Sequence, residues 1–280
     1  MKNFPLVSVV IATKNEEKNI ADCLVSIKQQ SYLQKSIEII VVDNSSTDKT
    51  TQIARKYTVK IFNQGPERSL QRNFGLLRKA TGKYLVFLDA DMRLSPKVIA
   101  KAVNLLEKST LVGLYLPEKI SGRFFWNKVR NFERSFYDGT VIDCVRVIKA
   151  PVFRKSGGFD PELTGPEDWD LDKKIRKLGE TAVLKEAVIY HDEGKFNLKK
   201  YLKKKSYYSQ SFNKYIKKWG KNDPDIKKQF GLFYRFCGVF IENKKWRKLV
   251  LHPFLTLGII YLRIFVGLMY LSRKYNFDDK

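Results

Sequence analysis

The ten residues YLVFLDADMR, 84 to 93, place two acidic side chains at the end of an apolar run. Tyr84 to Leu88 is rich in aromatic and branched residues, which is typical of a strand covered on both faces. Asp89 and Asp91 follow at its carboxyl end, where open α/β sheets bind their ligands. Two carboxylates this close repel each other unless a cation or a hydrogen-bond network holds them together. A divalent metal ion shared with a phosphate explains the pair, and an acid-rich turn that closes a strand is the alternative.

Strand and helix patterns alternate regularly over the first 115 or so residues. Strands are predicted at 6–12, 37–43, 59–63 and 83–89, and helices at 16–30, 48–57, 69–80 and from Ser95-Pro96 onward. The later sequence predicts a helix at 124–137, a strand at 144–150 and one or two short strands ending at His191. This alternation indicates an α/β fold, with a mostly parallel sheet and helices on both faces.

The composition fits one large domain, or one domain with an appendage. The chain has 280 residues, of which 44% are hydrophobic, so it has enough apolar residues for a core. Cys23, Cys144 and Cys237 are widely spaced and form no CxxC pair, which favours a thiol-reducing cytosol. The opening MKNFPLVSVV has too short a basic and apolar run for a signal peptide, and we interpret it as the approach to the first strand.

The net charge of +24 is concentrated near the C-terminus, where residues 195–248 contain 17 Lys or Arg and three acids. Such a field favours an anionic partner: nucleic acid, an acidic membrane leaflet or a phosphorylated lipid. The apolar segment 249–272 follows directly, and as a helix it would be about 36 Å long. A basic block beside an apolar segment is typical of a membrane anchor, and the sequence has no recognisable nucleic-acid motif, so we expect no nucleic-acid partner. We therefore divide the chain into a catalytic domain, 1–195, and a basic helical membrane-associating region, 196–280.

The apolar segment 249–272 has three possible placements: across a bilayer, in the plane of a membrane, or buried as a soluble helix. Arg263 near mid-membrane would cost roughly 3 kcal/mol. One narrow stripe of the helical wheel holds His252, Thr256, Arg263, Gly267 and Tyr270. This stripe would face protein or headgroups while the remaining surface faces lipid.

Two further acidic sites stand where the predicted topology would bring them near the first pair. Asp43 ends the second strand, where a carboxylate either accepts hydrogen bonds from a nucleobase or ribose, or forms an Asx turn. The stretch GPEDWDL, 165 to 171, carries Glu167, Asp168 and Asp170 at the start of a helix. The helix dipole stabilises acids there whatever their function, but three of them after Gly and Pro make a strongly negative loop.

Basic side chains and a histidine complement these acids. In GPERSLQRNFG, 65 to 75, Arg68 and Arg72 are four residues apart and would share a helix face. They could clamp a diphosphate, or they could form a solvated basic face. His191 ends a predicted strand next to two acids, where it is either a structural residue or a ligand for an ion such as Mn²⁺.

Six motifs together resemble a known family. In chain order they are VVIATKNEE, VVDNSSTD, QRNFG, FLDADM, GGFDPEL with GPEDWDL, and YHDEG. Over roughly residues 5 to 195 they are similar to the inverting family 2 glycosyltransferases of GT-A fold. The resemblance implies a Rossmann-like α/β fold, a UDP- or GDP-sugar donor, and Mn²⁺ or Mg²⁺ as cofactor. The chain lacks the QxxRW string and the several spans of processive synthases, so polymer synthesis is not expected.

The resemblance also implies roles for individual residues. Ala12, Thr13 and Glu16 would line the nucleotide pocket, and Asp43 would hold the base. The other matched positions are Arg72 near the phosphates, Asp89 at the ribose or a metal-bound water, Asp91 and His191 at the metal, and Asp168 as catalytic base. We add Arg68 and Glu167 to the expected nucleotide-sugar-binding set.

The chemistry agrees with these roles. Displacing a nucleoside diphosphate builds negative charge on the leaving phosphate, which a metal ion and arginine stabilise. An acceptor hydroxyl needs a carboxylate to take its proton, and one base opposite the leaving group implies inversion. We expect a metal-dependent inverting glycosyltransferase that acts on a membrane or lipid-linked acceptor at an anionic membrane surface, on the cytoplasmic face of the cell membrane.

Two alternatives stay open. A polyprenyl-phosphate glycosyltransferase, similar to dolichol-phosphate-mannose synthase, would use an already ionised phosphate as nucleophile and would need no base. A non-catalytic nucleotide-sugar-binding membrane protein would bind nucleotide without turnover.

Overall fold

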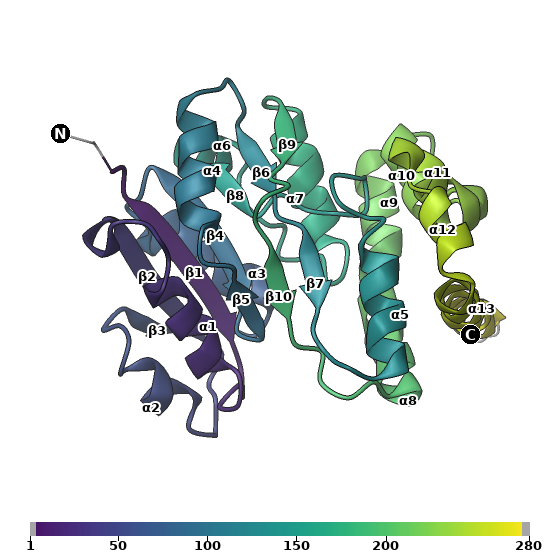
Figure 1. Cartoon of the computed structure of the whole chain (residues 1–280), viewed down its shortest axis with the longest axis horizontal. Helices are drawn as coiled ribbons and strands as arrows, with labels where there is room; N and C mark the ends of the chain where they lie inside the picture. The colour runs from purple at the N-terminus through teal and green to yellow at the C-terminus, as the bar shows by residue number, and fades with distance from the viewer. Residues whose placement is uncertain (1–3, 276–280) are drawn as a thin grey trace.

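A seven-stranded mixed sheet organises the chain in the computed structural model, which describes residues 4–275 (Figure 1). Its strands are β1 (Val7–Thr13), β2 (Ile37–Asp43), β3 (Ile61–Asn63), β4 (Tyr84–Asp89), β6 (Gly113–Tyr115), β8 (Val147–Lys149) and β9 (Thr181–Val183). They are ordered β3-β2-β1-β4-β8-β6-β9. The four strands from β3 to β4 are parallel, whereas β8 runs antiparallel to both of its neighbours. The expected α/β fold with a mostly parallel sheet is confirmed.

Helices cover both faces of this sheet, as the alternation predicts. Helices α1 (Ile20–Lys28), α2 (Thr50–Ala54) and α4 (Val98–Glu107) pack on one face. The π-helical turn η2 (Phe74–Lys79) and helices α6 (Ala150–Lys155) and α7 (Glu167–Arg176) pack on the other. Because the central strands are covered on both sides, Val9 and Ile11 enter one core and Val10 enters the other. Burial on both faces of the sheet explains why these strands are continuous apolar runs in the sequence.

A second, three-stranded sheet lies beside the first, and the sequence did not predict it. It is formed by β5 (Met92–Leu94), β10 (Ile189–His191) and β7 (Glu118–Ile120), in the order β5-β10-β7. Strand β10 pairs antiparallel with β5, so that His191 stands opposite Met92. This pairing brings the histidine that ends β10 to the residue that follows Asp91.

Several helices are shorter than the sequence indicates, and backbone hydrogen bonds explain the largest difference. The helix expected at 16–30 begins only at Ile20. Asn15 has a φ of 53°, and the N–H groups of residues 15–17 donate to the side chains of Ser46, Thr50 and Asp48 instead of joining a helix. Where one helix is expected at 69–80, the structure has α3 (Arg68–Asn73) followed by the turn η2. Of the helix expected at 48–57, only the residues of α2 are helical.

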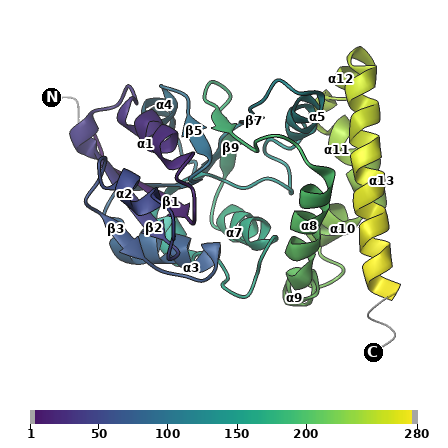
Figure 2. The same cartoon turned by 90° about the horizontal axis from the view of Figure 1, so that it is seen from below.

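The C-terminal helices stack on α5 (Phe125–Arg134), on the side away from β3 (Figure 1, Figure 2). They are α8 (Leu198–Tyr208), α9 (Phe212–Trp219), α10 (Pro224–Phe230), α11 (Val239–Ile241), α12 (Arg247–Leu251) and α13 (Pro253–Tyr275). Val129 and Phe136, from α5 and the turn after it, share a buried cluster with Phe240, Ile259 and Leu262. The division of the chain at residue 195 stays a prediction, and residues on both sides of it contribute to this one cluster.

Helix α13 turns Arg263, which lies in the polar stripe of its helical wheel, toward the protein. Arg263 Nε lies 3.1 Å from Glu133 Oε1, and its Nη2 donates to Tyr137 at 2.9 Å. The His252 ring contacts Phe132 at a centroid distance of 5.4 Å. Within the part of the chain that the structure describes, α13 is the one helix long and apolar enough to cross a membrane, a test of length and composition only.

Candidate active site

The carboxyl ends of three neighbouring strands bring the expected nucleotide-binding residues to one edge of the sheet. Parallel pairing places Thr13 beside Asp43 and Ala12 beside Asp89. Glu16 follows in the loop after β1, where burial and the negative charges of Asp91 and Asp89 raise its pKa against a hydrogen bond from Asn19. The loop and the strand ends therefore form one acidic edge, as their order in the sequence predicts.

Asp43 makes the contacts of a turn. Its Oδ2 accepts a hydrogen bond of 2.7 Å from the Ser46 N–H, and its Oδ1 accepts one from the Ser46 hydroxyl. Below it, the buried Gln71 donates to the carbonyl oxygens of Thr13 and Val42, at 2.9 and 2.8 Å. Gln71 thus ties α3 to the ends of β1 and β2. It is the first residue of the QRNFG motif, but the sequence did not predict this contact.

The Arg72 guanidinium is fully buried and joins two acids that are far apart in the chain. Its Nη2 lies 2.6 Å from Asp89 Oδ1, and its Nη1 lies 2.9 Å from Asp168 Oδ1. The rings of Phe87 and Phe159 each lie 5.2 Å from the guanidinium carbon, in cation–π range. The end of β4 and the start of α7 are therefore held together by one cation.

Arg68 makes the second bridge across the same acids. Its Nη2 lies 3.0 Å from Glu167 Oε1, and its Nη1 lies 3.8 Å from Asp89 Oδ2. It also donates to the Tyr208 hydroxyl of α8 at 3.3 Å.

The two arginines change the pKa of Asp89. Burial alone would raise this pKa, but the positive charges of Arg72 and Arg68 outweigh burial and hold it well below its usual value. Burial and the neighbouring Asp168 raise the pKa of Glu167.

Asp91 and His191 meet beside this cluster, from the loop between β4 and β5 and from the end of β10. Asp91 Oδ2 lies 3.2 Å from His191 Nε2, and the buried Asp91 Oδ1 has no hydrogen-bond partner among the described residues 4–275. His191 Nδ1 lies 2.7 Å from Glu118 Oε1 of β7. Burial would lower the pKa of His191, but its hydrogen bonds to Asp91 and Glu118 raise it to about 10.

The Asp91–His191 pair fits a cation that is shared with a ligand. Within residues 4–275, no three His, Cys, Asp or Glu side chains form a metal-binding cluster. The unpartnered Asp91 Oδ1 nevertheless leaves one buried carboxylate oxygen without a donor, which a hard divalent cation satisfies. Two protein ligands are also usual for Mg²⁺, which takes its remaining ligands from phosphate and water.

Sequence reasoning missed three residues that contact the predicted set. Glu118 and Arg146 lie in stretches where the pattern of strands and helices is loose, and Tyr208 lies in the basic region. Arg146 Nη2 is 3.9 Å from Asp168 Oδ2, so a second guanidinium faces the carboxylate that Arg72 holds. Tyr208 could have been found only by knowing that α8 returns to the site.

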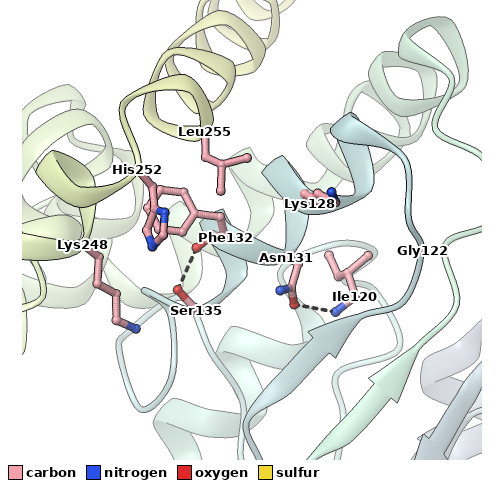
Figure 3. Close-up of a pocket in the computed structure, with 9 residues that line it drawn as sticks. All are labelled: Ile120, Gly122, Lys128, Asn131, Phe132, Ser135, Lys248, His252 and Leu255. Atoms are coloured by element: carbon pink, nitrogen blue, oxygen red, sulfur yellow. Dashed lines mark hydrogen bonds between the residues drawn. The ribbon is translucent and has the colours of Figure 1, made fainter.

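A separate cavity of about 420 Å³ lies where α5 meets the turn between α12 and α13. Its lining comprises Ile120, Gly122, Lys128, Asn131, Phe132, Ser135, Lys248, His252 and Leu255. Figure 3 shows the His252 ring beside Phe132 and the Asn131 side chain bonded to the Ile120 backbone. The cavity shares no residue with the acidic cluster, so it is not the candidate active site.

The sequence model of glycosyl transferase family 2 matches residues 8–157, which is more than half of the chain. The chain belongs to this family. The match begins in β1 and ends after α6, so it includes Asp43, Arg72, Asp89 and Asp91 and stops before Asp168. Family 2, which the motifs predict, is confirmed, whereas inversion and membrane association stay predictions.

Relatives in sequence and proteins of similar fold add further comparisons. The chain is 31% identical over 158 residues to a dolichol-phosphate mannosyltransferase of Pyrococcus furiosus, covering 52% of this chain and 44% of that protein. The solved structure of the mannosyltransferase PcManGT of Pyrobaculum calidifontis, with GDP-Man and Mn²⁺, superposes with a TM-score of 0.66 at 21% identity, covering 96% of this chain and 85% of that one.

A structure of S. aureus TarS in complex with UDP-GlcNAc has a TM-score of 0.60 at 18% identity, covering 92% of this chain and 79% of that one. At 21% and 18% identity, these two comparisons show that the chain shares the fold of both proteins. The chain matches less than two-thirds of the length of the first curated relatives.

Replacing Arg72 with methionine should destabilise the fold, because Asp89 and Asp168 would then lose the buried guanidinium that lies between them and keep only the longer contacts to Arg68 and Arg146. We expect the free energy of unfolding to fall by about 3 kcal/mol, as for other buried ion pairs that lose one partner. Urea denaturation followed by tryptophan fluorescence measures this change. The exposed Arg55→Met is the matched control and should shift the free energy by less than about 0.5 kcal/mol. Equal stability of the two variants would contradict the bridging role.

Proposed function

We propose that the chain transfers a sugar from a UDP- or GDP-sugar to an acceptor at a membrane, with inversion at the sugar carbon. The observation that carries this proposal is the Arg72 bridge, which holds Asp89 and Asp168 together beside the Asp91–His191 pair. Membership of family 2 supports the reaction class. The bound GDP-Man and UDP-GlcNAc of the two proteins of similar fold support a nucleotide-sugar donor.

The nucleotide would lie along the carboxyl edge of β1 and β2. Ala12, Thr13 and Glu16 would line its pocket, and Asp43 would accept hydrogen bonds from the base. Asp43 is already oriented by Ser46, so this role requires the turn to open or the base to bond at its remaining lone pairs. Ligand binding outside the carboxyl ends of the strands is the rule for open α/β sheets.

Asp91 and His191 would hold Mn²⁺ or Mg²⁺, and Asp89 would reach the ribose or a metal-bound water. The ion would supply positive charge against the diphosphate that leaves. Arg72 and Arg68 contribute fixed positive charge on the same side, although each is already paired with carboxylates. Because these charges are in place before the reaction, they cost little reorganisation as negative charge develops.

Asp168 would take the proton of an acceptor hydroxyl. Its side chain is 26% exposed, whereas Glu167 beside it is 3% exposed, so Asp168 is the more accessible carboxylate. Arg72 and Arg146 fix the orientation of its two oxygens. Glu167 would support the donor side of the site through Arg68.

A panel of UDP- and GDP-sugars tests the reaction directly. The protein in detergent, with lipid extract as acceptor, should release nucleoside diphosphate from one donor in the presence of Mn²⁺ or Mg²⁺. EDTA should abolish release, and Asp91→Asn should lower it at least 100-fold, because one charged metal ligand is lost. Release that needs neither metal nor Asp91 would contradict the proposed site. Tight nucleotide binding without release from any donor would favour the non-catalytic alternative.

A polyprenyl phosphate as nucleophile is the second candidate, favoured by the similarity to a dolichol-phosphate mannosyltransferase. The variant Asp168→Asn separates the two. A hydroxyl acceptor needs the base, so kcat should fall about 10²- to 10⁴-fold while the affinity for the donor is retained. A phosphate acceptor is already ionised, so kcat should change little. Asp160→Asn is the control, since Asp160 lies in the same loop region and binds Lys218.

We further propose that α13 lies in the plane of an anionic membrane, on its cytoplasmic face. Phe254, Leu257 and Ile264 are 76%, 62% and 48% exposed, while Arg263 on the opposite side is bound to α5. Figure 2 shows α13 lying beside α5 and α8. Crossing the bilayer would carry those charged helices into it, so the in-plane arrangement is favoured over a span. The uncompensated lysines of 195–248 suit acidic headgroups.

Vesicle flotation tests the membrane contact. The double variant Leu257→Asp/Ile264→Asp should lose at least tenfold in binding to phosphatidylglycerol vesicles, because two apolar side chains that contribute about 1.5–3 kcal/mol each on burial are replaced by anions. Val59→Asp, at an even more exposed apolar position near β3, should bind as the wild type does. Equal binding of the two variants would exclude α13 as the membrane-contacting helix.

A further inference from the structure

We propose that Glu118 is a positioning residue that holds the His191 ring so that its Nε2 faces Asp91 and the metal ion. This proposal rests on the proposed metal role of Asp91 and His191. The family motifs do not include Glu118, which lies outside every string that marks the family in this sequence. The inference comes from the small sheet β5-β10-β7 and from the contacts on it.

Strand pairing places Glu118 and His191 on one side of the small sheet. Strands β7 and β10 are parallel, with Glu118 opposite Ile189 and Ile120 opposite His191. Residues two apart in a strand share a face, so Glu118 and His191 are diagonal neighbours. The 2.7 Å distance between Glu118 Oε1 and His191 Nδ1 is that of a strong, charge-assisted hydrogen bond.

This hydrogen bond decides which ring nitrogen can bind a metal. An ionised carboxylate only accepts hydrogen bonds, so Nδ1 carries the proton and donates it to Glu118. The Nε2 atom then turns to Asp91, whose Oδ2 is 3.2 Å away. When a metal ion displaces the proton from Nε2, the neutral ring would keep Nδ1–H on Glu118 and offer its Nε2 lone pair, which is the arrangement of carboxylate–histidine–metal triads.

Glu118 is itself fixed by a chain of buried contacts. Its second oxygen, Oε2, lies 3.2 Å from Arg134 Nη2, and the same nitrogen lies 2.8 Å from Asp143 Oδ1. The other Asp143 oxygen accepts from the Gly139 N–H at 2.9 Å. The side chains of Glu118, Arg134 and Asp143 are 8%, 13% and 2% exposed. The orientation of Glu118 is therefore set by α5 and the loop that follows it, independently of His191.

A purely structural ion pair would show the same distances, so the test must separate orientation of His191 from stability of the fold. A measurement of Mn²⁺ affinity separates these two effects. The affinity is measured from the EPR signal of free Mn²⁺ during titration of the full-length protein, alone and with saturating UDP or GDP. The variants are Glu118→Ala, Glu118→Gln, His191→Ala and the double variant Glu118→Ala/His191→Ala, with urea denaturation to compare their folded fractions.

We expect Glu118→Ala to weaken Mn²⁺ binding about 10- to 100-fold, close to the effect of His191→Ala. Glu118→Gln keeps an acceptor oxygen for Nδ1–H and should recover most of that loss. The double variant should bind no more weakly than His191→Ala alone, because Glu118 acts through the imidazole. Glu193→Ala is the matched control: this acid stands two residues from His191, binds Arg130 at 3.2 Å, and should leave Mn²⁺ affinity unchanged.

Three results would overturn the proposal: wild-type Mn²⁺ affinity in folded Glu118→Ala, additive losses in the double variant, or no Mn²⁺ binding by the wild type. The proposed function fails by a different measurement. Wild-type protein that binds Mn²⁺ through Glu118 and His191 but releases no nucleoside diphosphate from any donor would refute sugar transfer and leave the positioning role of Glu118 intact.

Discussion

The buried guanidinium of Arg72 is the interaction on which the site and much of the fold depend. Removing a charge from water is costly unless it is paired and hydrogen-bonded. Arg72 meets that condition only when Asp89 and Asp168, 17 and 96 residues away in the chain, converge on it. The two aromatic rings that flank it come from β4 and from the loop before α7. The arrangement of acids that the proposed reaction would use is thus also the arrangement that makes the burial of Arg72 tolerable.

Arg72 also reduces the repulsion between the carboxylates that surround it. Without a cation, the largely buried side chains of Asp89, Asp168 and Glu167 would repel one another. With Arg72 and Arg68 between them, Asp89 stays ionised at any ordinary pH, as the direction of its pKa shift indicates. Stability that comes from this depressed pKa is present above the usual aspartate pKa and is lost only as the pH falls far below it. A negative edge is therefore available for a cation and a nucleotide-sugar without unfolding the loops that carry it.

The sequence predicted the parts of the site that follow from local periodicity. Asp43, Asp89 and Thr13 end strands whose apolar runs are unmistakable, and parallel pairing must bring such ends to one edge. It could not predict that Arg68 binds Glu167 or that Arg72 binds Asp168, because these acids come from the start of α7, about a hundred residues later. The strands β5, β7 and β10 have three residues each, too few for a period-two pattern to be recognised. Glu118 was missed for that reason, although it lies next to the histidine that the sequence did single out.

Helix α5 explains why a charged residue can stand in the middle of an apolar helix. Arg263 would be costly in lipid, yet it bonds Glu133 and Tyr137, and its guanidinium carbon lies 4.3 Å from the Phe240 ring. Burial opposes ionisation of Glu133, but Arg263 and Arg130 lower its pKa to about 2, so the pair stays charged. The next residue on α5, Arg134, points the other way and holds Glu118. One turn of α5 thus contacts both the apolar helix α13 and the carboxylate behind His191. Glu133, which binds Arg263 of α13, and Arg134, which binds Glu118, are adjacent on α5. The C-terminal helices therefore pack against the same turn of α5 that holds Glu118, even though none of their residues belongs to the family motifs.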